Sequence, residues 1–142
     1  MRIAEVLRKK GSDVATISPD ATVTELLAVL AERNVGALVV VENERIVGIV
    51  SERDVVRRAH ERGAAILSAK VAEIMTTDVA TCDPAETVDH LTVLMTQRRI
   101  RHVPVIDNGR LCGIVSIGDV VKNRMDELEE AQKQLQAYIL QG

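Results

Sequence analysis

Residues 48–54 read GIVSERD and residues 113–119 read GIVSIGD. The flanking sequence matches as well: aligning residues 14–59 with residues 79–124 without a gap gives 18 identities in 46 positions. The same turn residues fall in register in both segments. Self-similarity of this kind is the signature of a repeated structural unit. The sequence therefore predicts two copies of one unit that follow each other along the chain.

Each copy carries the same order of secondary-structure signals. In the first copy, a short strand around residues 14–17 precedes a helix whose apolar residues recur every three or four positions. β-branched residues then predict two strands, over 38–41 and 45–50, and Ser51 opens a second helix. The predicted fold class is α/β (α+β), with two βαββα repeats packed around a pseudo-twofold axis, an arrangement that would bury both faces of each small sheet.

The predicted domain boundaries divide the chain into three segments. The first repeat, with a lead-in helix at its N-terminus, covers 1–67, the second repeat covers 68–124, and a C-terminal helical extension covers 125–142. Six residues in and just before this extension recur at alternating spacings of four and three, which is a coiled-coil a/d pattern. They are Val121, Met125, Leu128, Gln132, Leu135 and Ile139. The helix could pack on its own module or pair with a second copy. We expect a homodimer formed through module faces, with this helix contributing.

Composition narrows the function classes. The chain has 142 residues, of which 46% are hydrophobic, and this is enough to bury a core. Tyr138 is the single aromatic residue and the net charge is −3, so both the stacking platform and the basic field of a nucleic-acid-binding protein are missing. Cys82 and Cys112 are too few for a disulfide framework. We expect a cytoplasmic protein without a signal peptide or a membrane span.

The repeated Ser-x-x-Asp element has two interpretations. A hydroxyl at the first turn of a helix lies beside unpaired N–H groups and the positive end of the helix dipole, where a phosphate is favoured. An aspartate one turn later can accept hydrogen bonds from a ribose diol, as acidic residues do in other nucleotide sites. The same pair also fits a capping box that only stabilises the helix. The residues alone leave both interpretations open for Ser51 and Asp54 and for Ser116 and Asp119.

The complete ordered set of motifs resembles a tandem cystathionine-β-synthase (CBS) domain pair, or Bateman module, of the small stand-alone bacterial type. Its carriers are VAT at 14–16, RHVPV at 101–105 and the two GIVSxxD segments. The resemblance extends from about residue 3 to residue 124. It implies a regulatory ligand sensor that binds AMP, ADP, ATP, NAD(H) or S-adenosylmethionine in clefts between the repeats. Such a module would report energy or redox state through a dimer or partner interface.

The resemblance also implies roles for individual residues. It places a ribose-binding carboxylate in each repeat, with a hydroxyl residue before it, base- or ribose-facing residues on the first strand, and a basic phosphate-facing pair ahead of a Pro-containing strand. The implied residues are Asp54 and Asp119, Ser51 and Ser116, Thr16, Ile17, Thr81 and Cys82, and Arg101 and His102 with Pro104. Gly36 and Ala37 replace the basic pair in the first repeat, so we expect unequal clefts. Arg53 has no counterpart in the second repeat and is either a phosphate ligand or a solvated helix residue.

No sequence motif indicates catalysis. The chain lacks G-x-S-x-G, H-E-x-x-H, Walker and G-x-G-x-x-G motifs, and its three histidines are too scattered for a zinc site. We therefore expect a module that is not an enzyme, with no metal, no covalent cofactor and an unidentified effector protein as partner. The alternative is a protein-interaction scaffold with vestigial clefts, against which the presence of both aspartates argues.

Overall fold

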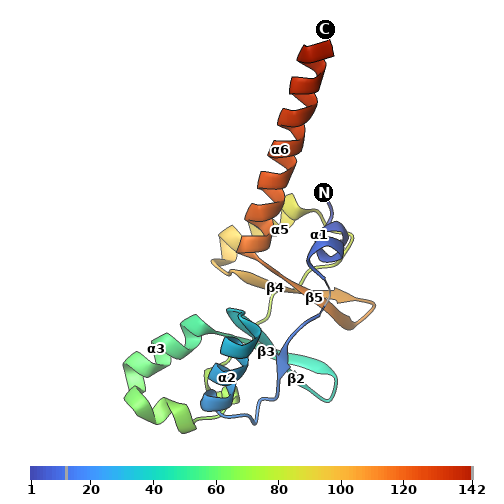
Figure 1. The fold of residues 1–142 in the computed structure, drawn as a ribbon. Coiled ribbons are helices and arrows are strands. Elements are labelled where there is room, and N and C mark those ends of the chain that lie inside the picture. Colours follow the sequence, from blue (N-terminus) through green and yellow to red (C-terminus); the bar gives the residue numbers. More distant parts are fainter. Residues whose placement is uncertain (12, 142) are drawn as a thin grey trace. The chain divides into compact units, whose positions relative to one another are not determined.

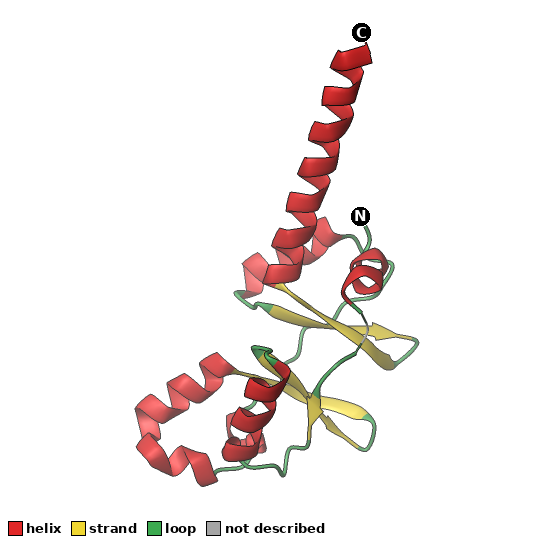
Figure 2. Ribbon diagram, viewed as in Figure 1, coloured by secondary structure: helices red, strands yellow, loops and turns green. Residues whose placement is uncertain are grey.

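A computed structural model describes residues 1–11 and 13–141 of the chain (Figures 1 and 2). The described residues form two compact units. The Asp54 unit comprises Asp13–Thr81, and the Asp119 unit joins the described residues of Met1–Ser12 with those of Cys82–Gly142. The predicted α/β class with a long C-terminal helix is confirmed.

The Asp54 unit is built on a three-stranded sheet in the order β1-β2-β3. β1 pairs in parallel with β2, which pairs in antiparallel fashion with β3. The elements in chain order are β1 (Thr16–Ile17), α2 (Val23–Arg33), β2 (Ala37–Glu42), β3 (Arg45–Ser51), α3 (Glu52–Arg62), the 3₁₀ helix η1 (Gly63–Ser68) and α4 (Val71–Ile74). The β-branched residues that predicted the strand pair lie in the core, where Leu38, Val39, Val40 and Val50 are fully buried.

Capping residues determine where α2 begins and ends. Thr22 caps α2 by accepting a hydrogen bond from the Glu25 N–H to its Oγ1 at 3.2 Å. Asn34 ends the helix in the left-handed conformation, which Asn adopts more readily than most residues. α2 then buries Val23, Leu26 and Leu30 on one face, as the helical spacing in the sequence predicts.

The Asp119 unit repeats this plan with a shorter sheet. Its elements are α1 (Ile3–Lys10), α5 (Val88–Arg98), β4 (His102–Asp107), β5 (Arg110–Ser116) and α6 (Ile117–Gln141). β4 and β5 form an antiparallel pair. Residues 79–82, which align with the first predicted strand at 14–17, form only one parallel bridge at Cys82, whose N–H donates to the carbonyl of Pro104 at 3.0 Å.

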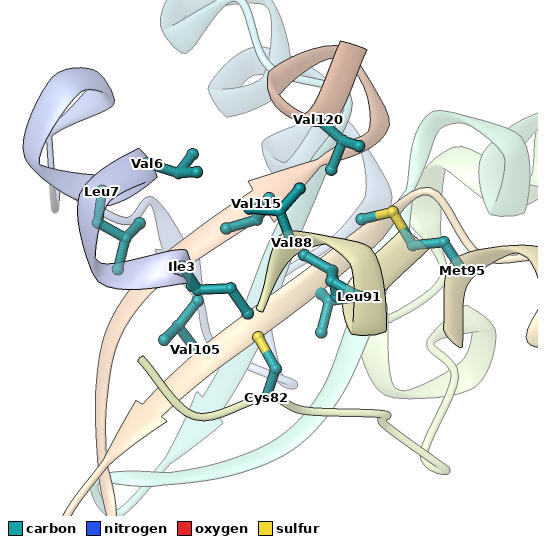
Figure 3. Close-up of a cluster of buried hydrophobic side chains, with 11 residues drawn as sticks. Ile3, Val6, Leu7, Cys82, Val88, Leu91, Met95, Val105, Val115 and Val120 are labelled. Atoms are coloured by element: carbon teal, nitrogen blue, oxygen red, sulfur yellow. The ribbon is translucent and has the colours of Figure 1, made fainter. Parts of the chain in front are cut away.

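The core of the Asp119 unit draws on segments distant in sequence (Figure 3). Figure 3 shows Ile3, Val6 and Leu7 of α1 directed toward side chains of α5, β5 and α6. The buried members are Ile3, Val6, Leu7, Cys82, Val88, Leu91, Met95, Val103, Val105, Val115 and Val120. The core is entirely aliphatic and sulfur-containing, as the composition predicts.

Each lead-in helix packs on the unit formed by the other sequence repeat. α1 belongs to the Asp119 unit, where a Cβ added at Gly113 would lie 2.6 Å from Leu7 Cδ2. α4 belongs to the Asp54 unit, where a Cβ added at Gly48 would lie 2.7 Å from the Sδ of Met75, the residue after α4. The compact units therefore assign the two lead-in helices differently from the predicted segments 1–67 and 68–124. Alignment of the repeats shows the order of motifs along the chain, but it does not show which sheet a flanking helix covers.

The last helix of the second repeat and the predicted C-terminal extension form one continuous helix. α6 has 25 residues and continues without a break from the second helix of the repeat into the segment predicted as a separate extension at 125–142. Within the described residues, no helix has both the length and the apolar character that crossing a membrane requires.

Candidate functional site

Both Ser-x-x-Asp elements adopt the same reciprocal geometry at a helix start. At α3, the Ser51 N–H donates to Asp54 Oδ2 at 2.9 Å and the Asp54 N–H donates to Ser51 Oγ at 3.3 Å. At α6, the corresponding distances for Ser116 and Asp119 are 2.8 and 3.2 Å. Each pair is thus a capping box, and this structural interpretation of the motif is correct at both positions.

Capping leaves part of each carboxylate open. The serine Oγ–H also donates to Oδ2, at 3.1 Å in the Asp54 unit and 3.0 Å in the Asp119 unit. Among the residues that the structure describes, no hydrogen bond ends on Oδ1 of either aspartate. An ionised carboxylate has about four acceptor positions. The caps therefore hold each carboxylate in a fixed orientation beside a helix N-terminus and leave Oδ1 available to a hydroxyl donor.

Lys10 makes the two boxes electrostatically different. Its Nζ lies 2.6 Å from Asp119 Oδ2 and 2.7 Å from the carbonyl oxygen of Ile114. Partial burial raises the pKa of Asp119, but the hydrogen bonds from Lys10 and Ser116 outweigh burial and lower that pKa below its ordinary value. In the described part of the chain, Asp54 has no such cationic partner.

No sequence pattern predicted the contact between Lys10 and Asp119. Lys10 lies in a run of charged residues in α1, which sequence analysis assigned to the first repeat, so its placement beside the second aspartate could not be foreseen. Lys10 reaches Asp119 because α1 packs on the unit of the second repeat. In the Asp54 unit, α4 ends at Ile74, and the residues that follow it include no lysine at the position aligned with Lys10.

A shallow groove lies beside Asp119 within its own unit. It has a volume of about 290 Å³, slightly below the range of roughly 300–1,000 Å³ that is usual for a complete small-molecule site. Its lining residues are Val6, Lys9, Lys10, Asp119, Lys122, Asn123 and Asp126. Three lysines face two carboxylates, so this groove could take an anionic fragment of a ligand, such as one phosphate.

Strand pairing brings the predicted basic pair next to the second box. His102 lies opposite Ser116 in the β4–β5 register, and the carbonyl of Arg101 accepts the N–H of Ile117 at 2.8 Å. In the Asp54 unit, Ala37 lies opposite Ser51, and the carbonyl of Gly36 accepts the N–H of Glu52 at 3.0 Å. The backbone around the capping box therefore has the same strand register and the same hydrogen bond in both units.

The remaining predicted site residues divide into exposed and buried side chains. Thr16 and Thr81 are exposed, as is Arg53 on the first turn of α3, while Pro104 is buried in β4. Ile17 and Cys82 are core residues. Burial, with Glu86 contributing, raises the pKa of the Cys82 thiol to about 12. The Cys82 side chain is therefore an inert part of the core, as the aliphatic residue at its aligned position predicts.

Comparison with known proteins identifies the class. The sequence profile of the CBS domain matches residues 3–61 and again residues 71–126. The chain belongs to the CBS-domain family and carries two copies of the domain, which confirms the resemblance drawn from the sequence.

Individual relatives show how far this similarity extends. The chain is 38% identical to the CBS domain-containing protein CBSX3, mitochondrial, of Arabidopsis thaliana, over 99% of this chain and 72% of the relative. It is 34% identical to the CBS domain-containing protein YhcV of Bacillus subtilis, over 80% of this chain and 81% of the relative.

Two solved structures are similar in fold and length. The CBS-domain containing protein ATU1752 from Agrobacterium tumefaciens has 43% identity and a TM-score of 0.86, covering 87% of this chain and 99% of that chain. The CBS domain pair of protein MJ0100, in complex with 5′-methylthioadenosine and S-adenosyl-L-methionine, has 25% identity and a TM-score of 0.80, covering 89% of this chain and 98% of that chain.

Proposed function

We propose that this protein is a regulatory module that binds adenosine-containing ligands through its two Ser-x-x-Asp boxes, without chemical turnover. The observation that carries the proposal is the pair of capped carboxylates, each with Oδ1 available beside a helix N-terminus. The similarity to the MJ0100 domain pair, whose structure contains two adenosine derivatives, supports the same ligand class.

In the proposed mode of binding, Oδ1 of Asp54 or Asp119 accepts a hydrogen bond from a ribose hydroxyl. The capping bonds hold the carboxylate in place before the ligand arrives, so little side-chain entropy is lost on binding. The base and the rest of the ribose contact the first-strand positions through the exposed hydroxyls of Thr16 and Thr81, because the side chains of Ile17 and Cys82 lie in the cores.

The proposed sites differ in their preference for charge. In the second repeat, Arg101 and His102 flank the box and Lys10 lies against its aspartate. The cationic side chains of Arg101 and Lys10 favour a phosphorylated ligand such as AMP, ATP or NAD(H). In the first repeat, Gly36 and Ala37 occupy the positions that correspond to Arg101 and His102, and Arg53 lies on the first turn of α3. The first repeat would suit a less anionic ligand, such as S-adenosylmethionine.

The proposed output is a shift in population. A ligand that contacts both repeats favours one of their relative arrangements by as much as its affinities for the two arrangements differ. A tenfold difference in affinity corresponds to about 1.4 kcal/mol, which is enough to change the occupancy of a dimer interface or an effector surface.

Calorimetric titration with AMP, ATP, NAD⁺, NADH and S-adenosylmethionine tests the proposal. We expect at least one ligand to bind, with affinity lost in Asp54→Asn/Asp119→Asn. Because these substitutions also weaken helix caps, the matched control is Thr22→Ala/Thr87→Ala, which removes the N-caps of α2 and α5. Each lost cap costs about 0.5–2 kcal/mol of stability. Failure of every ligand to bind folded, nucleotide-free protein would favour an interaction scaffold in which the boxes act only as caps.

A further inference from the structure

The α6 helix carries an apolar stripe, which we call the α6 stripe. It consists of the six a/d residues Val121, Met125, Leu128, Gln132, Leu135 and Ile139. Its central and distal apolar side chains are mostly exposed, with 63% of Leu128, 59% of Leu135 and 65% of Ile139 open to solvent. Such a row of large aliphatic residues on one helix face is typical of a buried contact.

The Asp119 unit does not cover the distal part of this stripe, from Leu128 onward. α6 packs on the unit through Val120 and Asn123, which are buried, and through Glu127, which is half-buried. At about 100° per residue, the stripe is centred roughly 130° around the helix from that packed face. From Leu128 to Gln141 every residue is exposed, and Figure 1 shows this part of α6 projecting beyond α1 and α5.

An uncovered helix of this length is poorly stable by itself. Isolated helices shorter than roughly 12–15 residues are marginal in water, and most helical stability in proteins comes from packing an apolar face. The 14 residues from 128 to 141 have no such packing within the described chain. A partner surface is therefore needed to make the distal half of α6 a stable helix.

We propose that the α6 stripe forms a parallel, two-stranded coiled coil with α6 of a second copy of this chain. In this assignment Met125, Gln132 and Ile139 occupy a positions. Leucine at the d positions 128 and 135 is compatible with two-stranded packing. This surface is independent of the nucleotide sites proposed above.

Charge complementarity selects the parallel arrangement. Arg124 occupies a g position and Glu129 the following e position, so each Arg124 lies beside Glu129 of the second copy, twice per dimer. An antiparallel pair overlapping along the whole stripe would instead place Glu129 opposite its own copy. Within its own chain Arg124 contacts Asp89 and Glu127, each at 3.3 Å. These exposed pairs are weak enough to be exchanged.

Gln132 specifies the register. It is the one polar member of the stripe, and in the parallel arrangement its amide meets the Gln132 amide of the second copy. A side-chain amide both donates and accepts hydrogen bonds, so the two can satisfy each other. A single polar a residue fixes register and strand number at some cost in stability. An antiparallel pair would leave this amide against Leu128.

Disulfide trapping of two neighbouring variants tests the arrangement. In the full chain, Gln132→Cys places a thiol opposite its copy, whereas Lys133→Cys places one on the outward face next to it. We expect Gln132→Cys to give a covalent dimer in oxidised glutathione at least about tenfold faster, because pairing raises the effective concentration of its thiol. The unsubstituted chain measures the background from Cys82 and Cys112. Equal rates for the two variants would overturn the proposal.

Hydrogen exchange provides the second readout. Amides 128–141 should be protected in the unsubstituted chain and lose protection in Leu128→Glu/Leu135→Glu. They should keep it in Gln134→Glu/Ala137→Glu, which adds the same charge to the outward faces. Exchange of these amides in the unsubstituted chain as fast as in the stripe variant would contradict the proposal. Both experiments are done without nucleotide, so their outcome does not depend on the proposed function.

Discussion

Replacing Lys10 with methionine tests the contact that makes the two boxes unequal. Lys10→Met keeps the unbranched apolar stem of the side chain but removes the charge that lies 2.6 Å from Asp119 Oδ2. A hydrogen bond to a charged group contributes about 1.5–3 kcal/mol when shielded from solvent. The side chains of Lys10 and Asp119 are 32% and 22% exposed, so screening by solvent reduces the expected loss to about 1 kcal/mol at neutral pH.

The effect should depend on pH with a defined sign. The folded-state pKa of Asp119 is lowered, so its contribution to stability is fully present above the unfolded-state pKa, near 3.9. It is lost as the pH falls through the folded-state pKa. The unsubstituted chain and Lys10→Met should therefore differ in free energy of unfolding at pH 7 and converge in strong acid.

Two assays check this prediction. Urea unfolding at pH 7 measures the loss of stability, and the carboxyl chemical shift of Asp119, followed by NMR over a pH titration, should show that Lys10→Met raises its pKa. Lys9→Met is the matched control, because Lys9 forms no ion pair among the described residues. An unchanged Asp119 titration in Lys10→Met, or an equal loss of stability in Lys9→Met, would refute the reasoning.

Three further predictions concern the core. Gly113→Ala should destabilise the chain by about 1–3 kcal/mol, because its Cβ would lie 2.6 Å from a Leu7 side-chain carbon. In a double-mutant cycle with Leu7→Ala, measured by urea unfolding, the two losses of stability should be less than additive. Strict additivity would exclude the contact. Cys82, buried and with a pKa of about 12, should resist a thiol reagent at pH 8 until the chain is unfolded, whereas the half-buried Cys112 should react first; labelling of both at one rate in the native protein would contradict this. Leu38→Ala, at a fully buried position, should lower the free energy of unfolding by about 2–5 kcal/mol, and a loss below about 1 kcal/mol would show that the side chain is not packed as described.

Local sequence signals predicted most of the fold. The strand pairs, the helices after them and the two capping boxes follow from β-branched runs, helical spacing and Ser-x-x-Asp, all of which act over a few residues. The CBS family assignment was likewise carried by short motifs in fixed order. The sequence could not decide whether the boxes only cap helices, since capping and ligand binding require the same residue types.

The features that sequence analysis missed depend on contacts between distant segments. Lys10 reaches Asp119, 109 positions away, because α1 packs on β5 and α6. That packing depends on Leu7 fitting against Gly113, and no periodic pattern encodes it. The continuity of α6 with the extension was missed for a related reason: the repeat alignment ends inside a helix that continues beyond it.

The most direct test of the central claim is to compare the binding of AMP and 2′-deoxy-AMP by calorimetry, in the unsubstituted chain and in Asp54→Asn/Asp119→Asn. If the box carboxylates bind the ribose hydroxyls, removing the 2′-hydroxyl should weaken binding to the unsubstituted chain by about tenfold or more, as expected for a hydrogen bond to a charged group. The same change in ligand should make little difference to the double variant. Equal affinity of the unsubstituted chain for the two nucleotides would contradict the account and leave the boxes as helix caps.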